Sequence, residues 1–261
     1  MAATRTLNRL ECVGKTLRAA LNRIATFAPA WLQAWVPVEW FDRYCRAIEE
    51  YRLPKGIEAR QAHAEVIGSD GMQLLERIWE DTAPPELRQL PAVEILRRTW
   101  IHQYQIVEGL VRLRAAKNIP PAGERMDSPY DPDARFGNKH STTWTGYKVH
   151  WTETCDDEQV HLITHVMTTH GHQTDLGQTE EVHQALEAKG LLPAEHLVDT
   201  AYVDSPLMPN SEPRYGITLI GPMRPNVSWQ ANLGGSYDLS KFRINWKTQK
   251  VTCPQGKKSR S

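Results

Sequence analysis

Cysteine is scarce in this chain, and its four residues are far apart: Cys12, Cys45, Cys155 and Cys253 in 261 residues. None forms a CxxC pair, which argues against a disulfide framework and against a structural zinc site. No apolar stretch approaches the length that a bilayer requires, and the N-terminus has no apolar core like that of a signal peptide. These absences predict a protein of the reducing cytoplasm with no membrane association.

An excess of one charge is absent too, because 31 basic and 31 acidic residues give a formal net charge of +0. The chain therefore has no global positive field to attract nucleic acid. Basic residues do gather near the two ends, where solvated surface is the simpler interpretation: Arg5, Arg9, Lys15, Arg18, Arg23, Lys257, Lys258 and Arg260. GxSxG, Walker and GxGxxG sequences are also missing, which disfavours hydrolases, NTPases and dinucleotide-binding enzymes.

Residues 1–117 read as a helical region. Apolar residues recur at three- and four-residue steps from Leu7 to Phe27, which predicts an amphipathic helix that Pro29 ends. Pro91 is well placed to open the last and longest helix, whose apolar face extends to Val111. Between these two, the pattern predicts helices over Val38–Arg52, Ile57–Ile67 and Gly71–Glu80. The region is expected to form a helical bundle with short connections.

The pattern changes after this region. Residues 118–140 are rich in proline and glycine and read as a linker. Residues 141–224 give the order strand, strand, helix, strand, helix, strand, which indicates an α/β unit. The strands are TWTGYKVHW, VHLITHVMTT, a short run before Asp199, and GITLIGP, while a helix from Asp175 should stop at Gly190. Residues 225–261 read as β-rich, so the fold class is α+β.

Asp199 is the strongest single candidate for a functional residue. It ends the apolar run of AEHLVDTAYVD, and ligands favour the carboxyl ends of strands in open α/β sheets. A carboxylate there can hold Mg²⁺ beside a phosphodiester if other carboxylates converge on it. Its alternative role is to cap the helical turn that follows.

Two other polar clusters each have more than one interpretation. The run DSPYDPDAR places Asp127, Asp131 and Asp133 close together, which suits either a divalent cation or, as we favour, a turn whose side chains bond their own backbone. A histidine cluster upstream of the helix at Asp175 lies near Cys155 but matches no known zinc spacing, so solvent-facing or edge positions are favoured. Its members are His161, His165, His170 and His172.

A series of stretches covering nearly the whole chain resembles, in the same order, the sequence blocks of bacterial insertion-sequence transposases of the DDE type. The matching stretches are LNRLECVGKTLRAALNRIA, SPYDPDARFGNK, TGYKVHWTETCDD, LITHVMTTHG, LLPAEHLVDTAYVD, LIGPMRPNVSWQA and KVTCPQGKKS. An ordered set of blocks is more specific than any single motif.

The resemblance implies a ribonuclease-H-like core in which two aspartates and one glutamate hold two Mg²⁺ or Mn²⁺ ions and act on transposon-end DNA. Asp199 maps onto the second aspartate of that set, and Ala201 stands where the family has glycine. The other two acids have no counterpart here, so we expect a fragment truncated at both ends, with an incomplete metal site, an exposed sheet edge and no activity by itself.

Two alternatives remain open. The chain could be a non-catalytic DNA-binding remnant that co-assembles with an intact transposase or with itself, using the basic first helix, where Arg18 lies, together with Arg135 and Lys148. It could instead be a metal nuclease that combines Asp199 with the acids of DSPYDPDAR, provided that these converge in space.

Overall fold

The structure is a computed structural model that describes residues 3–4, 7–139, 141–158, 160–203, 207–222, 229–233 and 237–259. The chain divides into two compact units, Met1–Thr174 and Asp175–Ser261, and the division falls inside the predicted 141–224 segment. Helices and strands are both well represented, which confirms the predicted α+β class.

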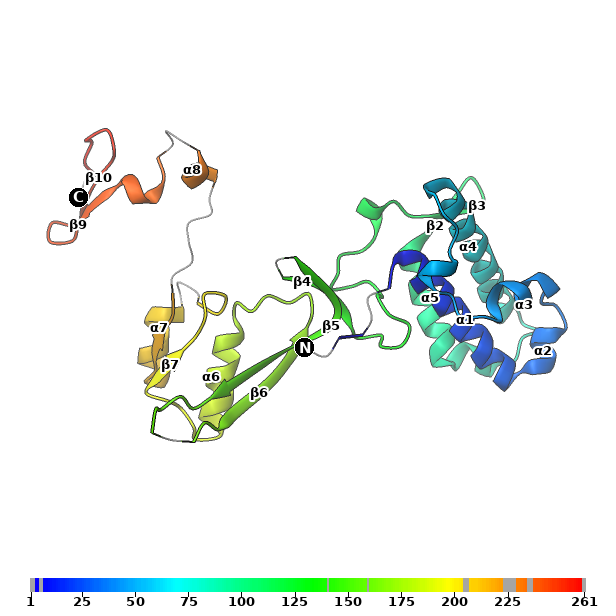
Figure 1. Cartoon of the computed structure of the whole chain (residues 1–261), viewed down its shortest axis with the longest axis horizontal. Helices are drawn as coiled ribbons and strands as arrows, with labels where there is room; N and C mark the ends of the chain where they lie inside the picture. The colour runs from blue at the N-terminus through cyan, green and yellow to red at the C-terminus, as the bar shows by residue number, and fades with distance from the viewer. Residues whose placement is uncertain are drawn as a thin grey trace. The chain divides into compact units, whose positions relative to one another are not determined.

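Helices of the first unit surround one hydrophobic core (Figure 1). The three main helices are α1 (Arg9–Phe27), α4 (Ile57–Trp79) and α5 (Pro91–Gln103), and each contacts the other two. Asn8 and Glu11 cap α1 reciprocally, each side chain accepting the other residue's backbone N–H. The shorter helices are α2 (Pro29–Gln33) and α3 (Val38–Tyr44), and 3₁₀ turns cover Glu50–Arg52, Pro85–Gln89 and Ala116–Asn118.

Helix α4 is continuous, so the predicted break between Ile67 and Gly71 is wrong. The glycines that suggested the break are contact points for α5. A Cβ on Gly71 would overlap the ring of Trp100, and one on Gly68 would overlap the ring of Tyr104. Trp100 also donates its Nε1–H to the carbonyl of Gly68 over 2.8 Å. Glycine here permits close helix packing.

Helix α5 ends at Gln103, earlier than predicted, because the chain turns into a hairpin. Strand β2 (Tyr104–Val107) pairs antiparallel with β3 (Leu110–Leu113). The two turn residues, Glu108 and Gly109, have φ of 51° and 75°. Positive φ at both positions is typical of the type I′ turns that join two strands tightly.

A four-stranded sheet completes the first unit. Its longest strand is β5 (Thr142–Glu153), which pairs antiparallel with β4 (Arg135–Lys139) and β6 (Ile163–His170) along one edge. Strand β1 (Ala3–Thr4) pairs antiparallel with β5 at Thr145 and Gly146. Strand β4 thus lies inside the predicted linker.

Much of the second edge of β5 has no partner strand within the described part of the chain. Beyond the two residues paired with β1, the backbone groups of Tyr147, Val149 and Trp151 face away from β6. Trp151 is 62% exposed. An exposed edge was expected, and an apolar one is prone to pair with other strands.

The second unit contains α6 (Gln178–Ala188), β7 (Glu195–Leu197), α7 (Leu207–Tyr215) and β8 (Thr218–Ile220), and β7 pairs parallel with β8. Gly190, at φ 68°, follows the end of α6 as predicted, and the N–H of Leu191 bonds the carbonyl of Leu186. The predicted helical turn over 202–207 lies partly outside the described residues. The remaining elements are α8 (Trp229–Asn232), a 3₁₀ turn at Leu239–Lys241, and a hairpin of β9 (Arg243–Asn245) with β10 (Lys250–Thr252).

None of the helices in the described part of the chain combines the length and the apolar character needed to cross a bilayer.

Candidate functional site

Asp199 follows the last backbone pairing of the parallel strands. The N–H of Val198 donates to the carbonyl of Ile220 over 2.9 Å, which extends the β7–β8 ladder to the residue before Asp199. The Asp199 side chain is exposed, and its Oδ1 accepts the N–H of Ala201 over 2.7 Å. The Asp199 carbonyl accepts the N–H of Tyr202 over 3.0 Å. The carboxylate therefore closes a turn through one oxygen at the carboxyl end of a strand.

Ala201 fits this turn without backbone strain. Among the non-glycine residues that the structure describes, only Glu108 and Gln249 have a positive φ. The turn therefore does not require glycine where Ala201 stands. The departure from the resembling family at this position leaves the placement of the carboxylate intact.

A second carboxylate lies close to this turn. The pKa of the Tyr202 hydroxyl is raised to about 12, first by burial and then by the negative charges of Asp175 and Asp199. Asp175 is only 8% exposed and precedes α6, whose Thr179 donates its hydroxyl to the Tyr202 carbonyl over 3.0 Å. The two aspartates, one before α6 and one after β7, thus both raise the pKa of the Tyr202 hydroxyl.

This donor set fits a divalent cation only in part. Within the described ranges, no group of three or more His, Cys, Asp or Glu residues is arranged to hold a metal ion. Mg²⁺ and Mn²⁺ prefer several oxygen ligands in a near-octahedral arrangement. Asp199 alone supplies one carboxylate of such a set, which is too few to fix the coordination of an ion by itself.

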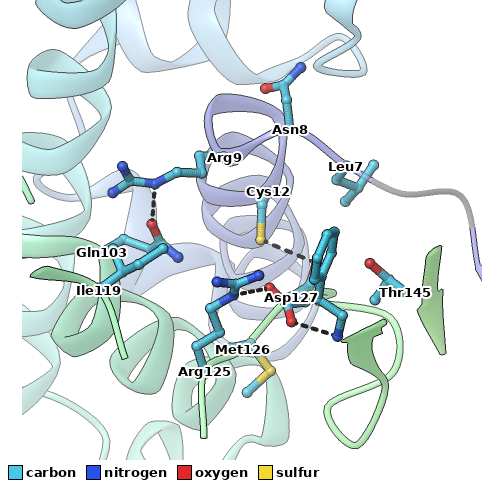
Figure 2. Close-up of a pocket in the computed structure, with 11 residues that line it drawn as sticks. Leu7, Asn8, Arg9, Cys12, Gln103, Ile119, Arg125, Met126, Asp127 and Thr145 are labelled. Carbon is cyan, nitrogen blue, oxygen red and sulfur yellow. Dashed lines mark hydrogen bonds and ion pairs between the residues drawn. The ribbon is translucent and has the colours of Figure 1, made fainter. Parts of the chain in front are cut away.

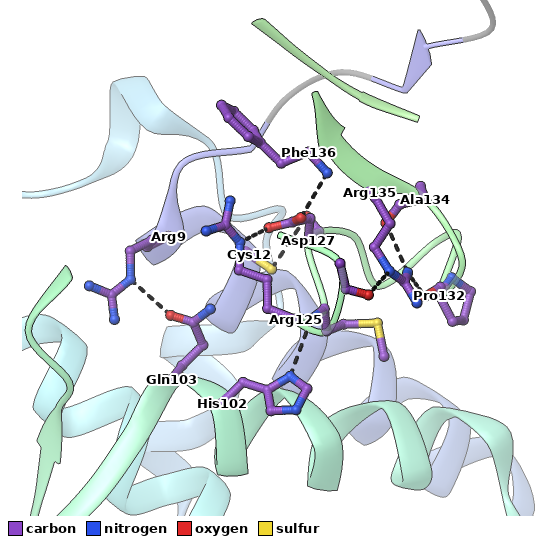
Figure 3. Close-up of polar contacts among 12 residues, drawn as sticks. Arg9, Cys12, His102, Gln103, Arg125, Asp127, Pro132, Ala134, Arg135 and Phe136 are labelled. Carbon is purple, nitrogen blue, oxygen red and sulfur yellow. Dashed lines mark hydrogen bonds and ion pairs between the residues drawn. The ribbon is translucent and has the colours of Figure 1, made fainter. Parts of the chain in front are cut away.

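The acids of DSPYDPDAR stabilise their own loop. Asp131 Oδ1 accepts the N–H groups of Asp133 and Ala134 over 3.1 Å each, which is the turn that the sequence favoured. Asp127 Oδ1 accepts Arg125 Nε–H over 2.6 Å, and its Oδ2 accepts the N–H of Phe136 over 3.0 Å (Figure 3). These carboxylates are held by backbone and arginine donors, as is usual for turn and loop aspartates.

The three predicted nucleic-acid-binding residues all bond backbone carbonyls. Arg135 donates to Gly123, Pro132 and Ala134, which ties the preceding loop to β4 (Figure 3). The ammonium of Lys148 donates to the Gln173 carbonyl over 2.5 Å. The Nε–H of Arg18 donates to the Tyr44 carbonyl over 3.0 Å, at the end of α3.

Arg135 and Lys148 nevertheless lie in one electrostatic neighbourhood. The pKa of His172 is lowered by burial first, and then by the positive charges of His170, Arg135 and Lys148. The rings of His170 and His172 stack, with centroids 5.9 Å apart. Arg18 contacts α3 instead, so the structure links two of the three predicted residues to a common group.

A cavity of about 220 Å³ lies beside the first turn of α1. Its walls come from α1, the end of α5, the loop that follows Ile119, and β5 (Figure 2). Two arginines face it, and each is oriented by a hydrogen bond: Arg9 Nε–H donates to Gln103 Oε1 over 2.8 Å, and Arg125 is held by Asp127. The full lining consists of Leu7, Asn8, Arg9, Cys12, Gln103, Ile119, Arg125, Met126, Asp127, Phe136 and Thr145.

No protein-family profile, curated protein or solved structure matches this chain. Its function must therefore follow from its own residues. Two of the stretches that carry the transposase resemblance meet at the cavity: the first supplies Leu7, Asn8, Arg9 and Cys12, and SPYDPDARFGNK supplies Phe136.

Sequence reasoning missed three arrangements that depend on long-range packing. They are the approach of Asp175 to Asp199 through Tyr202, the pair of arginines at the cavity, and a histidine pair in the second unit. In that pair, His183 Nε2 and His196 Nδ1 are 2.9 Å apart. Asp175 offered a partial signal, because an aspartate just before a helix is a common cap. The other two left no local signal.

Proposed function

We propose that this chain carries part of the catalytic region of a DDE-type DNA transposase, with Asp199 as one of its metal-holding carboxylates. The observation that carries the proposal is the position of Asp199 at the carboxyl end of β7, beside the parallel strand β8, in the block that resembles the family's second aspartate. The antiparallel pair β5–β6, followed by α6 and then β7, supports it, since this order suits a ribonuclease-H-like core.

Each residue of the Asp199 turn has a definable task in this proposal. Ala201 N–H orients the carboxylate through Oδ1, and Oδ2 has no hydrogen-bond donor among the described residues. Asp175 adds negative charge nearby, which favours a cation. A divalent ion bound there would activate a water or hydroxyl and stabilise the leaving oxygen of a phosphodiester. Further carboxylates and the DNA phosphate itself would complete its ligands.

Iron-mediated cleavage tests whether Asp199 holds a divalent ion. Fe²⁺ substitutes for Mg²⁺ and reduces added hydrogen peroxide to hydroxide and a hydroxyl radical, which cuts the polypeptide near the bound ion, while ascorbate returns Fe³⁺ to Fe²⁺. We expect weak cleavage beside Asp199 in the full chain, and stronger cleavage when a short DNA duplex is added, because phosphate oxygens supply additional ligands. Asp199→Asn should abolish this cleavage, and excess Mg²⁺ should compete with it.

Asp157→Asn is the matched control, since Asp157 is an exposed aspartate of the first unit. It should leave the cleavage unchanged. An identical fragment pattern in wild type and Asp199→Asn would exclude a metal-binding role for Asp199.

In a plasmid-nicking assay with Mn²⁺, we expect the chain alone to leave the DNA uncut. Nicking that Asp199→Ala abolishes would show that the site is complete.

Non-catalytic DNA binding is the second candidate, and a concentration of arginine favours it. The pKa of His102 is lowered by burial and by the positive charges of Arg98, Arg114 and Arg135, against one opposing acid, Glu124. Arg9 and Arg125 lie at the adjoining cavity. These five residues, the arginine group, outnumber the two acids beside them, Glu124 and Asp127, and give the first unit a local positive region although the whole chain is neutral. They are Arg9, Arg98, Arg114, Arg125 and Arg135. Such a region attracts phosphates.

The arginine group predicts strongly salt-dependent DNA binding. If about five phosphates are neutralised, the logarithm of the binding constant should fall with a slope of about −4.5 against the logarithm of salt concentration. Affinity for a duplex should then drop on the order of 10²- to 10³-fold between roughly 50 and 200 mM salt. Fluorescence anisotropy across this range measures the slope.

Arg98→Gln should make the slope shallower by about one, because one phosphate contact is lost. Arg46→Gln is the control, since Arg46 is exposed and lies outside the arginine group. Absence of binding even at the lowest salt would exclude this candidate, as would equal effects of the two substitutions.

A further inference from the structure

The cavity beside α1 has more positive than negative charge. Its lining contains two arginines and one aspartate. Asp127 is bonded to Arg125 and to the Phe136 backbone, so it balances one guanidinium. Cys12 adds no negative charge, because burial raises the pKa of its thiol to about 12. The lining therefore has one positive charge in excess.

Arg9 is the uncompensated group. Its Nε–H and Nη2–H donate to the Gln103 side chain and to the Arg114 carbonyl, over 2.8 and 3.0 Å. Both acceptors are neutral, and no described carboxylate forms an ion pair with this guanidinium. The pKa of Arg9 is lowered by burial and by the nearby charge of Arg125. A partly buried cation without a counter-ion gains from binding an anion.

The free donors of the two arginines match a phosphate group. Arg9 Nη1 and both Nη atoms of Arg125 have no hydrogen-bond acceptor among the described residues, while Arg125 is fixed by Asp127 and stacks over the Phe136 ring at 5.3 Å. Planar guanidinium groups held in this way bind phosphate oxygens in pairs. The cavity volume of about 220 Å³ leaves room for one phosphate group.

We propose that this cavity binds a phosphate group between Arg9 and Arg125, with Asp127 as the residue that orients Arg125. The phosphate can come from free phosphate in solution or from the 5′ end of a DNA strand, which has the same terminal chemistry. The site does not depend on the role of Asp199. Its apolar side, formed by Leu7, Ile119 and Met126, leaves space for an attached group.

Phosphate titration of the full chain tests the site. In low-salt buffer with ionic strength held constant by chloride, inorganic phosphate should raise the melting temperature in a saturable manner. Calorimetric titration should show Arg9→Gln and Arg125→Gln weakening phosphate binding at least tenfold. Arg9→Lys, which retains the charge but loses the planar fork, should lie between wild type and Arg9→Gln. Arg23→Gln, on the exposed face of the same helix, should bind like wild type.

Two oligonucleotides of one sequence, with a 5′-phosphate or a 5′-hydroxyl, distinguish the sources. If the phosphorylated strand binds more tightly than the hydroxyl strand, and if Arg9→Gln removes this difference in affinity, the site is assigned to DNA ends. Equal binding of both strands, together with arginine-dependent binding of inorganic phosphate, assigns it to free phosphate. The proposal fails if inorganic phosphate gives no saturable response, or if the response is the same in wild type, Arg9→Gln and Arg125→Gln. The inorganic phosphate result is independent of whether the chain binds DNA through Asp199 or the arginine group.

Discussion

Gly71→Ala should lower the free energy of unfolding of the first unit by about 2 kcal/mol, within the range of overpacked cores. Helix propensity alone predicts the opposite sign, because alanine is favoured over glycine in a helix by about 1 kcal/mol. Sterics decide the outcome. An added Cβ would overlap two ring carbons of Trp100 and lie 2.8 Å from its Nε1. Trp100 is only 2% exposed and its Nε1–H is bonded to Gly68, so the ring has little freedom to move.

Denaturant unfolding of the variants measures this effect. Ser69→Ala is the matched control, since Ser69 is an exposed residue of α4 and its replacement should change stability by a few tenths of a kcal/mol at most. A smaller ring at position 100 provides the second check. Gly71→Ala combined with Trp100→Phe should be less destabilised than the sum of the two single changes, because phenylalanine lacks the overlapping atoms. If Gly71→Ala instead stabilises the first unit, the ring of Trp100 on α5 does not lie against residue 71 of α4.

The elements that were predicted correctly are those whose cause is local. Helix α1 has its apolar stripe within a single segment, and its cap is formed by neighbours. Strands β5 and β6 follow from alternation and β-branched residues, and Gly190 ends α6 because it adopts a positive φ there. In each case a window of about twenty residues contains the information.

The errors have tertiary or unusual local causes. Gly68 and Gly71 resemble a helix break until the aromatic rings of α5 are placed against them. The sequence predicts the residues of the β2–β3 hairpin as a continuation of α5, because their apolar side chains also suit a helix. Its turn uses Glu108 with Gly109, and glutamate is a rare residue at positive φ compared with asparagine or aspartate.

The same distinction between local and long-range causes applies to the residues of the candidate site. Asp199 could be placed at the end of a strand from the sequence alone. Its nearness to Asp175 could not, because that depends on how α6 packs beside the Asp199 turn. The presence of Arg9 and Arg125 in one cavity lining likewise requires the loop after Ile119 to fold back on α1, which no local pattern encodes. A sequence predicts where a carboxylate ends a strand more readily than which charges come to face it.

Lowering the pH from 7 to 5 should destabilise the second unit by about 2 kcal/mol through its histidine pair. His183 on α6 is fully buried, and its Nε2 lies 2.9 Å from Nδ1 of His196 on β7. The pKa of His196 is lowered to about 4, by burial first and then by the charge of His183. The pKa of His183 is lowered by burial, against the opposing charge of Glu180.

Proton binding determines whether a fall in pH raises or lowers the stability of the second unit. A histidine of the unfolded chain titrates near 6.5. Below that pH the unfolded state binds more protons than the folded one, so the stability present at neutral pH is lost as the pH falls from about 6.5 to about 4. Among the described residues, Tyr215 is a further ionisable group beside the pair, since its ring contacts His183, and Arg214 forms an ion pair with Glu180. Glu180 also accepts the Tyr215 hydroxyl over 2.7 Å, which joins α7 to α6.

Hydrogen exchange of the α6 amides, corrected for the intrinsic effect of pH, measures the loss. Protection in wild type should fall roughly 30-fold between pH 7 and 5, since about 1.4 kcal/mol corresponds to tenfold. His196→Gln removes the group with the largest shift, so its α6 protection should depend much less on pH, even if it is lower throughout. His161→Gln, at an exposed histidine of the first unit, should behave like wild type. Equal losses in wild type and His196→Gln would mean that proton uptake elsewhere destabilises α6, and would remove the contact between His183 and His196 as the cause.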